Sequence, residues 1–185
     1  MTPQTPPPAD PRPLPGEPLA VDLLNTRWNN GGNPRDLLSS LDELALWLEV
    51  TGFAARGVPA EPLTLAALRT TREALLQLLA DPADEAARGE LNAVLAHGAV
   101  RRSLSAEGPV QRVETDSPAW LPAWSAAEDY LRLLAEAPGR IRSCAHPSCV
   151  LHFHDTSKNG TRRWHSMSSC GNRAKASRHY ARTKV

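Results

Sequence analysis

Three cysteines and one histidine form two pairs of equal spacing near the end of the printed sequence. The first pair is Cys144 and Cys149, the second is His165 and Cys170, and four residues separate the members of each pair. Three thiolates and one imidazole are a complete ligand set for a tetrahedral zinc ion. Such an ion supplies folding free energy to segments that are too short to bury a core of their own. The spacing therefore predicts one structural Zn²⁺ and a small zinc-stabilised module over residues 141–185.

Other assignments of these residues stay open at this point. His146, His152 and His154 lie close to the second cysteine and are alternatives to His165 as the fourth ligand. Three unpaired thiols in a reducing compartment are a second alternative. A disulfide framework is disfavoured, because the number of cysteines is odd and no signal peptide is recognised. We favour His165 because it repeats the spacing of the first pair.

The residues around the ligands resemble the CGNR zinc-finger family over roughly residues 142–182. The segment contains Phe153-x-Asp155-x-Ser157, then Arg162-Arg163-Trp164, then Cys170-Gly171-Asn172-Arg173, in the order that this family shows. The chain has His165 where most members have a third cysteine. The resemblance implies a zinc finger that binds DNA.

The charge of the chain is divided unequally. Residues 1–155 hold thirteen basic and twenty acidic side chains, whereas residues 156–185 hold eight basic and no acidic ones. A segment of this sign attracts polyanions, although a basic end is also typical of a solvated tail. If residues 167–182 are helical, Lys175, Arg178 and Arg182 share one face. The predicted DNA-contacting residues are Arg162, Arg163, Arg173, Lys175, Arg178 and Arg182.

The segment before the zinc ligands has mainly helical periodicity. A capping box at Ser40 to Glu43 predicts a helix to about residue 51, and apolar series predict helices near residues 65–79, 87–95 and 124–134. Short valine-containing runs between residues 99 and 115 predict a β-hairpin, and Pro138-Gly139 predicts a hinge. The expected fold class is mainly α: a helical N-terminal domain over residues 19–140 with one short hairpin, followed by the zinc-stabilised module.

The block from Asp22 to Arg27, with the helical pattern after it, resembles the ABATE domain, which commonly precedes the CGNR finger. The resemblance implies a stress-induced bacterial transcription regulator, in which the finger binds DNA and the larger domain senses an effector or dimerises. Asn25, Arg27 and Trp28 are the candidate effector-binding residues, and a homodimer is expected because one finger makes few base contacts. The alternative is a zinc-dependent module for protein or RNA contact. No motif favours an enzyme.

The first eighteen residues contain eight prolines and almost no packable apolar side chains. This composition predicts a disordered arm over residues 1–18. No run of apolar residues approaches the length of a membrane-spanning helix, so we expect a cytoplasmic protein without a membrane partner.

Overall fold

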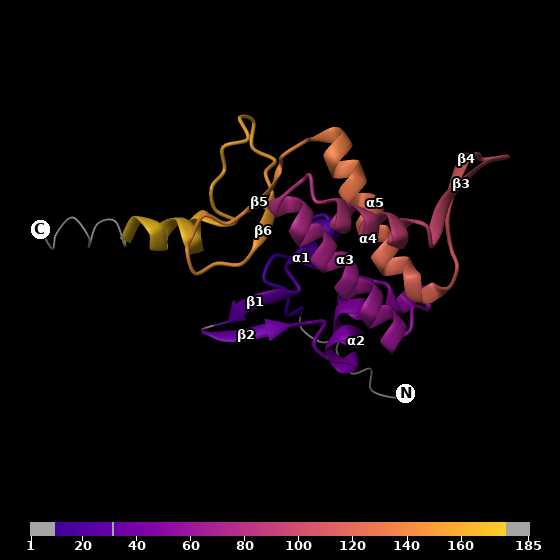
Figure 1. The fold of residues 1–185 in the computed structure, drawn as a ribbon, viewed down its shortest axis with the longest axis horizontal. Helices are drawn as coiled ribbons and strands as arrows, with labels where there is room; N and C mark the ends of the chain where they lie inside the picture. Colours follow the sequence, from indigo (N-terminus) through magenta and orange to yellow (C-terminus); the bar gives the residue numbers. More distant parts are fainter. Residues whose placement is uncertain (1–9, 31, 177–185) are drawn as a thin grey trace, which may run out of the picture.

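The computed structural model describes residues 10–30 and 32–176 (Figure 1). Five α-helices of the N-terminal part are α1 (Leu19–Leu24), α2 (Leu41–Val50), α3 (Pro62–Ala80), α4 (Glu85–Leu95) and α5 (Leu121–Glu136). Short 3₁₀ turns lie at Ala54–Arg56 and Pro118–Trp120. The predicted class, mainly α with a hairpin and a C-terminal metal module, is confirmed.

Local signals set the ends of the longer helices. The Ser40 hydroxyl accepts a hydrogen bond from the Glu43 amide at 3.2 Å, so the predicted cap begins α2. Asp84 caps α4 in the same way through the Ala87 amide at 3.0 Å. Pro62 occupies the first turn of α3, where its missing N–H costs nothing.

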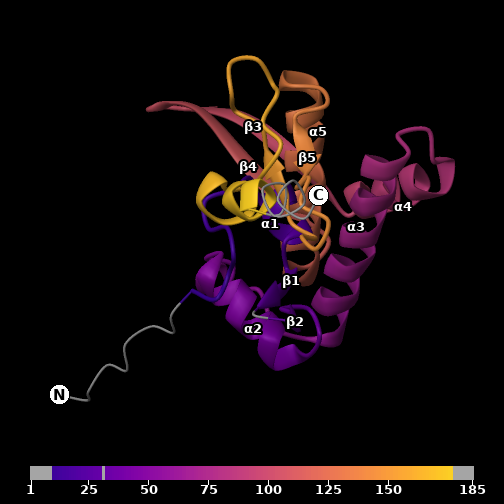
Figure 2. The same ribbon diagram turned by 90° about the vertical axis from the view of Figure 1, so that its left-hand side faces the viewer.

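Six strands form three separate antiparallel hairpins: β1 (Arg27–Asn30) with β2 (Asn33–Asp36), β3 (Gly98–Ser105) with β4 (Gly108–Thr115), and β5 (Ile141–Ser143) with β6 (His152–His154). The β3–β4 hairpin was predicted and projects away from the helices (Figures 1 and 2). The other two were not predicted, because strands of three or four residues show too little alternation to be recognised.

The hydrophobic core is shared by the helices and by the start of the C-terminal module. Helix α1 packs against α3 and α5, and these three helices supply most of the fully buried apolar side chains. Leu151, which lies between the first two cysteines and β6, belongs to the same buried cluster, and Cys149 packs against it. The C-terminal module therefore packs against the helical domain and is not connected to it by a linker alone.

An ion pair between a buried arginine and a half-buried aspartate joins α3 to the end of β2. Arg72 is 1% exposed, and its guanidinium donates two hydrogen bonds to the Asp36 carboxylate at 2.7 and 3.0 Å. A third hydrogen bond, to the Thr26 hydroxyl at 2.7 Å, reaches the segment before β1. Burial raises the pKa of Asp36, but the hydrogen bonds and charge of Arg72 outweigh it and hold that pKa below its usual value. The pair fixes the first hairpin against the longest helix.

The segment before α1 differs from the prediction of a free arm. Arg12 pairs with the buried carboxylate of Asp22 at 2.8 Å, and Leu14 packs against the core. Asp22 also accepts a hydrogen bond from the Trp47 indole at 2.8 Å. Residues 10–18 thus lie on the domain because a buried carboxylate requires a cation, a contact that proline content does not reveal. The rest of the predicted arm lies outside the described residues.

No helix in the described ranges is long and apolar enough to cross a membrane.

Candidate metal centre and its surroundings

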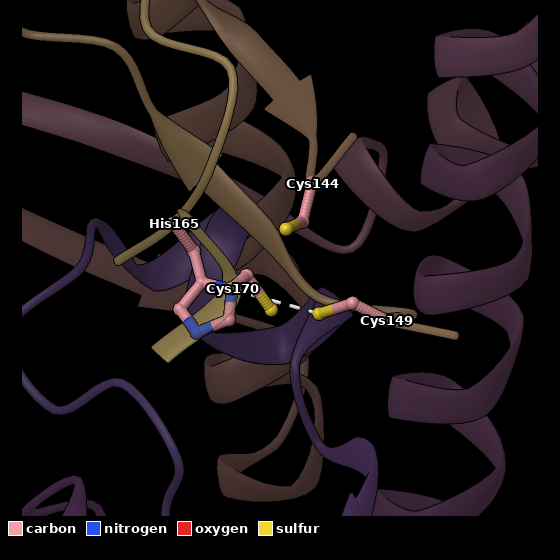
Figure 3. Close-up of side chains that lie close together, drawn as sticks. All are labelled: Cys144, Cys149, His165 and Cys170. Atoms are coloured by element: carbon pink, nitrogen blue, oxygen red, sulfur yellow. Dashed lines mark hydrogen bonds between the residues drawn. The ribbon is translucent and has the colours of Figure 1, made fainter. Parts of the chain in front are cut away.

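The four predicted ligands converge on one point. The Sγ atoms of Cys144, Cys149 and Cys170 and a ring nitrogen of His165 all lie within 4.8 Å of one another (Figure 3). The Cys149 Sγ atom is 3.5 Å from His165 Nδ1. Bonds of about 2.3 Å to sulfur and about 2.0 Å to nitrogen place two ligands of a tetrahedral zinc ion about 3.5 Å apart. The four side chains therefore form a Cys₃His site for one structural zinc ion.

Short elements of different kinds present these ligands. Cys144 follows β5, and its amide continues the hairpin by donating to the Leu151 carbonyl at 2.8 Å. A tight turn, in which the Cys149 amide donates to the His146 carbonyl at 2.9 Å, brings the second cysteine back. Cys170 lies in a π-helical turn over Met167–Gly171, which continues as an α-helix over residues 172–176. The β5–β6 hairpin thus positions the first ligand pair, and the start of the C-terminal helix follows the second.

The three competing histidines do not enter this cluster. The His146 ring nitrogen Nδ1 accepts a hydrogen bond from the Ser148 amide and lies 3.1 Å from the Ser148 hydroxyl. His152 and His154 lie on β6, where their backbone amides have other partners. The assignment of His165 as fourth ligand agrees with the geometry.

The surroundings of the thiols show why a cation is needed between them. Burial raises the pKa of Cys149 to about 12, and burial also raises the pKa of Cys170. Burial acts in the same direction on Cys144, but the backbone amides of His146 and His165 outweigh it and lower the pKa of that thiol. Three thiolates so close together repel one another. A bound Zn²⁺ compensates this negative charge and so favours the deprotonated form of each thiol. Burial and two nearby arginines lower the pKa of His165, which favours the neutral imidazole that a metal binds.

Two side chains support the ligands from outside. The Ser169 hydroxyl lies 3.2 Å from His165 Nε2, so it can accept a hydrogen bond from the N–H group at this nitrogen when Nδ1 faces the sulfurs. The Arg173 guanidinium donates to Cys170 Sγ at 3.5 Å. The arginine of the Cys-Gly-Asn-Arg sequence therefore offsets thiolate charge at the metal.

We expect Ser169→Ala to weaken zinc binding by about 10- to 100-fold, the range typical when a partner of a ligating histidine is removed. The hydroxyl fixes both the orientation and the tautomer of His165. Competition with a chromophoric chelator would measure the affinity. Ser168→Ala is the matched control, because the Ser168 hydroxyl contacts only Ser166 Oγ among described side chains. Equal affinities for the two variants would show that Ser169 does not orient the ring.

Asp155 organises the loop between the two ligand pairs. Its buried carboxylate accepts hydrogen bonds from the amide and hydroxyl of Ser157 at 3.0 and 2.6 Å and from the Arg162 amide at 3.0 Å. These hydrogen bonds, led by that of the Ser157 hydroxyl, hold the pKa of Asp155 below its usual value. The Phe-x-Asp-x-Ser sequence thus closes the loop that delivers His165 to the metal.

Arg162, one of the predicted DNA-contacting residues, has partners within the finger itself. Its guanidinium donates to the backbone carbonyls of Trp164 and His165 and lies over the Phe153 ring, 4.5 Å from its centroid. The side chain is half-buried. Arg162 therefore braces the ligand loop from within, because the carbonyls beside the metal need a donor, and its contact with DNA stays a prediction.

The other predicted DNA-contacting residues within the described ranges are exposed. Arg163 stacks on Trp164 at 5.2 Å and lines one hollow together with Ala174, so it lies beside the helix that carries Arg173 and Lys175. Arg163 and Lys175 have no carboxylate partner among the described residues. Arg178 and Arg182 lie outside the described residues. The exposed cations thus gather around the start of the C-terminal helix.

The candidate effector residues do not form one site. The Asn25 side-chain amide donates to the His152 carbonyl at 2.9 Å and accepts from the His152 amide at 2.8 Å. Arg27 pairs with Asp36 and lines a hollow beside His152, whereas Trp28 is buried and lines a different hollow beside Arg173. Asn25 instead connects the two parts of the chain, a role that its sequence neighbours do not reveal.

A second contact of the same kind extends this connection. The Glu17 carboxylate accepts a hydrogen bond from the His154 amide at 2.9 Å. Because β5 pairs with the opposite edge of β6, the side chains of Asn25 and Glu17 satisfy the edge that would otherwise be unpaired. The zinc module is therefore docked on α1 through the backbone of its own hairpin.

We expect Asn25→Ala to destabilise this docking by about 1–3 kcal/mol, because the His152 amide and carbonyl both lose a buried partner. Hydrogen exchange of the His152 amide would increase, and the zinc-loaded protein would melt at a lower temperature. Asn29→Ala is the control, because the Asn29 side chain is exposed on β1 and has no hydrogen bond with His152. If the His152 amide exchanged at the same rate in both variants, the contact would not hold the module.

Fold and site together define a class of protein: a small helical domain with a Cys₃His zinc finger docked on its first helix. The family model of the ABATE domain, described as a putative stress-induced transcription regulator, matches residues 17–137. The model of the CGNR zinc finger matches residues 140–183. Since the first match alone spans more than half of the chain, the protein belongs to the ABATE family, and it carries a CGNR zinc finger. No curated protein matches the sequence significantly.

Proposed function

We propose that the zinc finger binds duplex DNA through the cations around the start of its C-terminal helix, and that the chain acts as a cytoplasmic transcription regulator without a catalytic step. The observation that carries this proposal is the contrast between two sets of basic side chains. Several arginines of the helical domain, among them Arg12, Arg27 and Arg72, pair with carboxylates, whereas Arg102 and Arg112 on the distant β3–β4 hairpin have no such partner among the described residues. Arg163 and Lys175 are exposed and have no such partner among the described residues.

The position of these cations supports contact with a phosphate backbone. Arg163 comes from the loop before His165, and Lys175 lies on the helix that follows Cys170. Because a zinc ligand lies at one end of each segment, the metal holds the Arg163 and Lys175 side chains at a fixed separation. Preorganised cations release counterions from DNA without first losing conformational freedom of the backbone. Zinc thus contributes to DNA binding by ordering the contact surface.

Selection from a random duplex library with the zinc-loaded full chain tests the proposal. We expect a sequence to be enriched and the enrichment to vanish after chelation of zinc. Two related half-sites in the enriched sequence would additionally support binding as a homodimer. Zinc-loaded protein that enriches no duplex would contradict the proposal and favour a finger that contacts protein or RNA.

We expect the double substitution Arg163→Ala and Lys175→Ala to weaken DNA binding and to reduce its salt dependence. Each phosphate contact contributes about 0.9 to the slope of log K against log salt concentration, so two lost contacts lower the slope by about 2. Fluorescence anisotropy at several salt concentrations measures this slope. Arg102→Ala removes an exposed arginine from the distant β3–β4 hairpin and is the control. An unchanged slope in the double variant would place DNA on another surface.

A further inference from the structure

A hollow of about 420 Å³ lies where the ends of α3, α4 and α5 meet, on a side of the domain that the metal centre does not use. Its walls include Leu78 and Leu79 from the last turn of α3, Leu91 from α4, and Leu134 from α5. The volume falls within the range of small-molecule sites, which is about 300–1,000 Å³. The hollow is large enough for a ligand of moderate size.

The rim of this hollow exposes apolar surface. Leu131 and Leu134 are each 41% exposed, although both lie on the helix that supplies much of the core. A soluble domain leaves leucines at adjacent turns exposed at a hollow when a ligand covers them or when the surface meets a partner. Because the surface is concave and its deeper walls are leucines, an apolar small molecule fits it better than a flat protein surface would.

A few polar groups face the same hollow. Tyr130 is 4% exposed and lines it, and its hydroxyl makes no hydrogen bond with any described residue. Burial raises the pKa of Tyr130, so the hydroxyl is a neutral donor at ordinary pH. Arg88 and Asn92 line the hollow from exposed positions on α4. No Asp or Glu lines it among the described residues. The available groups can therefore recognise an acceptor or an anion.

The fourth wall is the connection to the zinc finger. Ala137, Gly139 and Ile141 line the hollow, and Ile141 is the first residue of β5. Ile141 pairs with His154 in β6, and Cys144 follows three residues later. A molecule in the hollow would therefore contact both the helical domain and the segment that leads to the first zinc ligand.

We propose that this hollow binds a small apolar carboxylic acid, with its hydrocarbon part among the leucines and its carboxylate toward Tyr130 and Arg88. The bound acid would contact the connecting segment and so favour one placement of the finger relative to the helices. A ligand shifts such an equilibrium only by its difference in affinity for the two placements. The regulatory consequence rests on the proposed binding of DNA by the finger, whereas the binding of the acid does not.

Binding is tested with decanoate as the probe and the zinc-loaded full chain. A fluorescent apolar sulfonate, anilinonaphthalene sulfonate, reports occupancy of the hollow, and decanoate is expected to displace it. Leu134→Glu places a like charge at the rim and should weaken decanoate binding more than 10-fold. Leu63→Glu is the matched control, because Leu63 is 44% exposed and lies at the opposite end of α3. Equal binding by the two variants, or none by the unmodified chain, overturns the proposal.

Two further measurements test the chemistry of the ligand. Tyr130→Phe should weaken decanoate binding about 5-fold, the effect of one hydrogen bond, without changing the fold. Decanol should bind more weakly than decanoate, because Arg88 attracts only the ionised group. Equal affinities for decanol and decanoate would overturn the assignment to an acid.

The regulatory consequence is measured separately. Decanoate should change the affinity of the chain for its selected duplex, and this change should be absent in Leu134→Glu. If the duplex binds but decanoate leaves its affinity unchanged while occupying the hollow, the coupling fails. If no duplex binds, the proposed function fails, while the decanoate titrations still decide whether the hollow is a site for an acid.

Discussion

Cys149→Ser is expected to abolish zinc binding and to unfold the C-terminal module. The hydroxyl is a poor ligand for zinc, and three remaining ligands leave the site open. Zinc contributes roughly 10–16 kcal/mol to the folding of short finger peptides, more than the few buried side chains of this module can replace. We expect less than about one tenth of an equivalent of zinc per chain by mass spectrometry. Amide protection should be lost over residues 141–176.

The helical domain is expected to remain folded in this variant but to lose stability. Unfolding of the finger removes the partners of Asn25 and Glu17 and uncovers the core around Leu151. The melting temperature of the helical domain should fall by several degrees, because a loss of about 1 kcal/mol lowers the melting temperature by about 4 °C in a domain of intermediate size. Ser148→Ala, in the same turn as Cys149, should keep both zinc and the melting temperature of the unmodified chain. Retention of one equivalent of zinc by Cys149→Ser would refute the ligand assignment.

Periodic patterns allowed most of the helical domain to be predicted. The Ser40 cap and the leucine spacing after it gave α2 nearly to the residue, and the apolar series gave α3, α4 and α5. The first two hairpin signals differ in strength. Strands β3 and β4 have eight residues each, whereas β1 and β2 have four each and are mostly polar, so no alternation of apolar residues predicted the β1–β2 hairpin.

The metal ligands could be predicted because zinc chemistry restricts residue type and spacing at once. The docking of the finger could not, because Asn25 contacts His152 across 127 residues and recognises only its backbone. Backbone groups are the same in every residue and leave no trace in a sequence. For a similar reason the sequence predicts a DNA contact for Arg162 but not the hydrogen bonds that its guanidinium donates to the backbone carbonyls of Trp164 and His165. Charge in a sequence identifies a cation but not the acceptor that it meets.

Asp36→Ala is expected to be the most damaging single substitution in the helical domain. It leaves the guanidinium of Arg72, which is 1% exposed, without the carboxylate that accepts two of its hydrogen bonds. Removing one partner of a buried pair costs about 3–5 kcal/mol, a large part of the roughly 5–15 kcal/mol that stabilises a domain. We expect the lower end of this range, because the Glu73 carboxylate remains 3.7 Å from Arg72 Nε. Urea unfolding of the zinc-loaded chain, followed by tryptophan fluorescence, measures the loss.

A second substitution distinguishes loss of a buried partner from a general defect at Asp36. In the double variant Asp36→Ala with Arg72→Met, the uncompensated charge is gone and an apolar side chain of similar length fills the space. We therefore expect the double variant to be more stable than Asp36→Ala alone. Glu114→Ala removes the exposed partner of Arg101 and should change the stability by less than about 1 kcal/mol. If Arg72→Met restored nothing, the cost would arise from the Leu38 amide, which donates to Asp36 at 2.9 Å, and not from the buried charge.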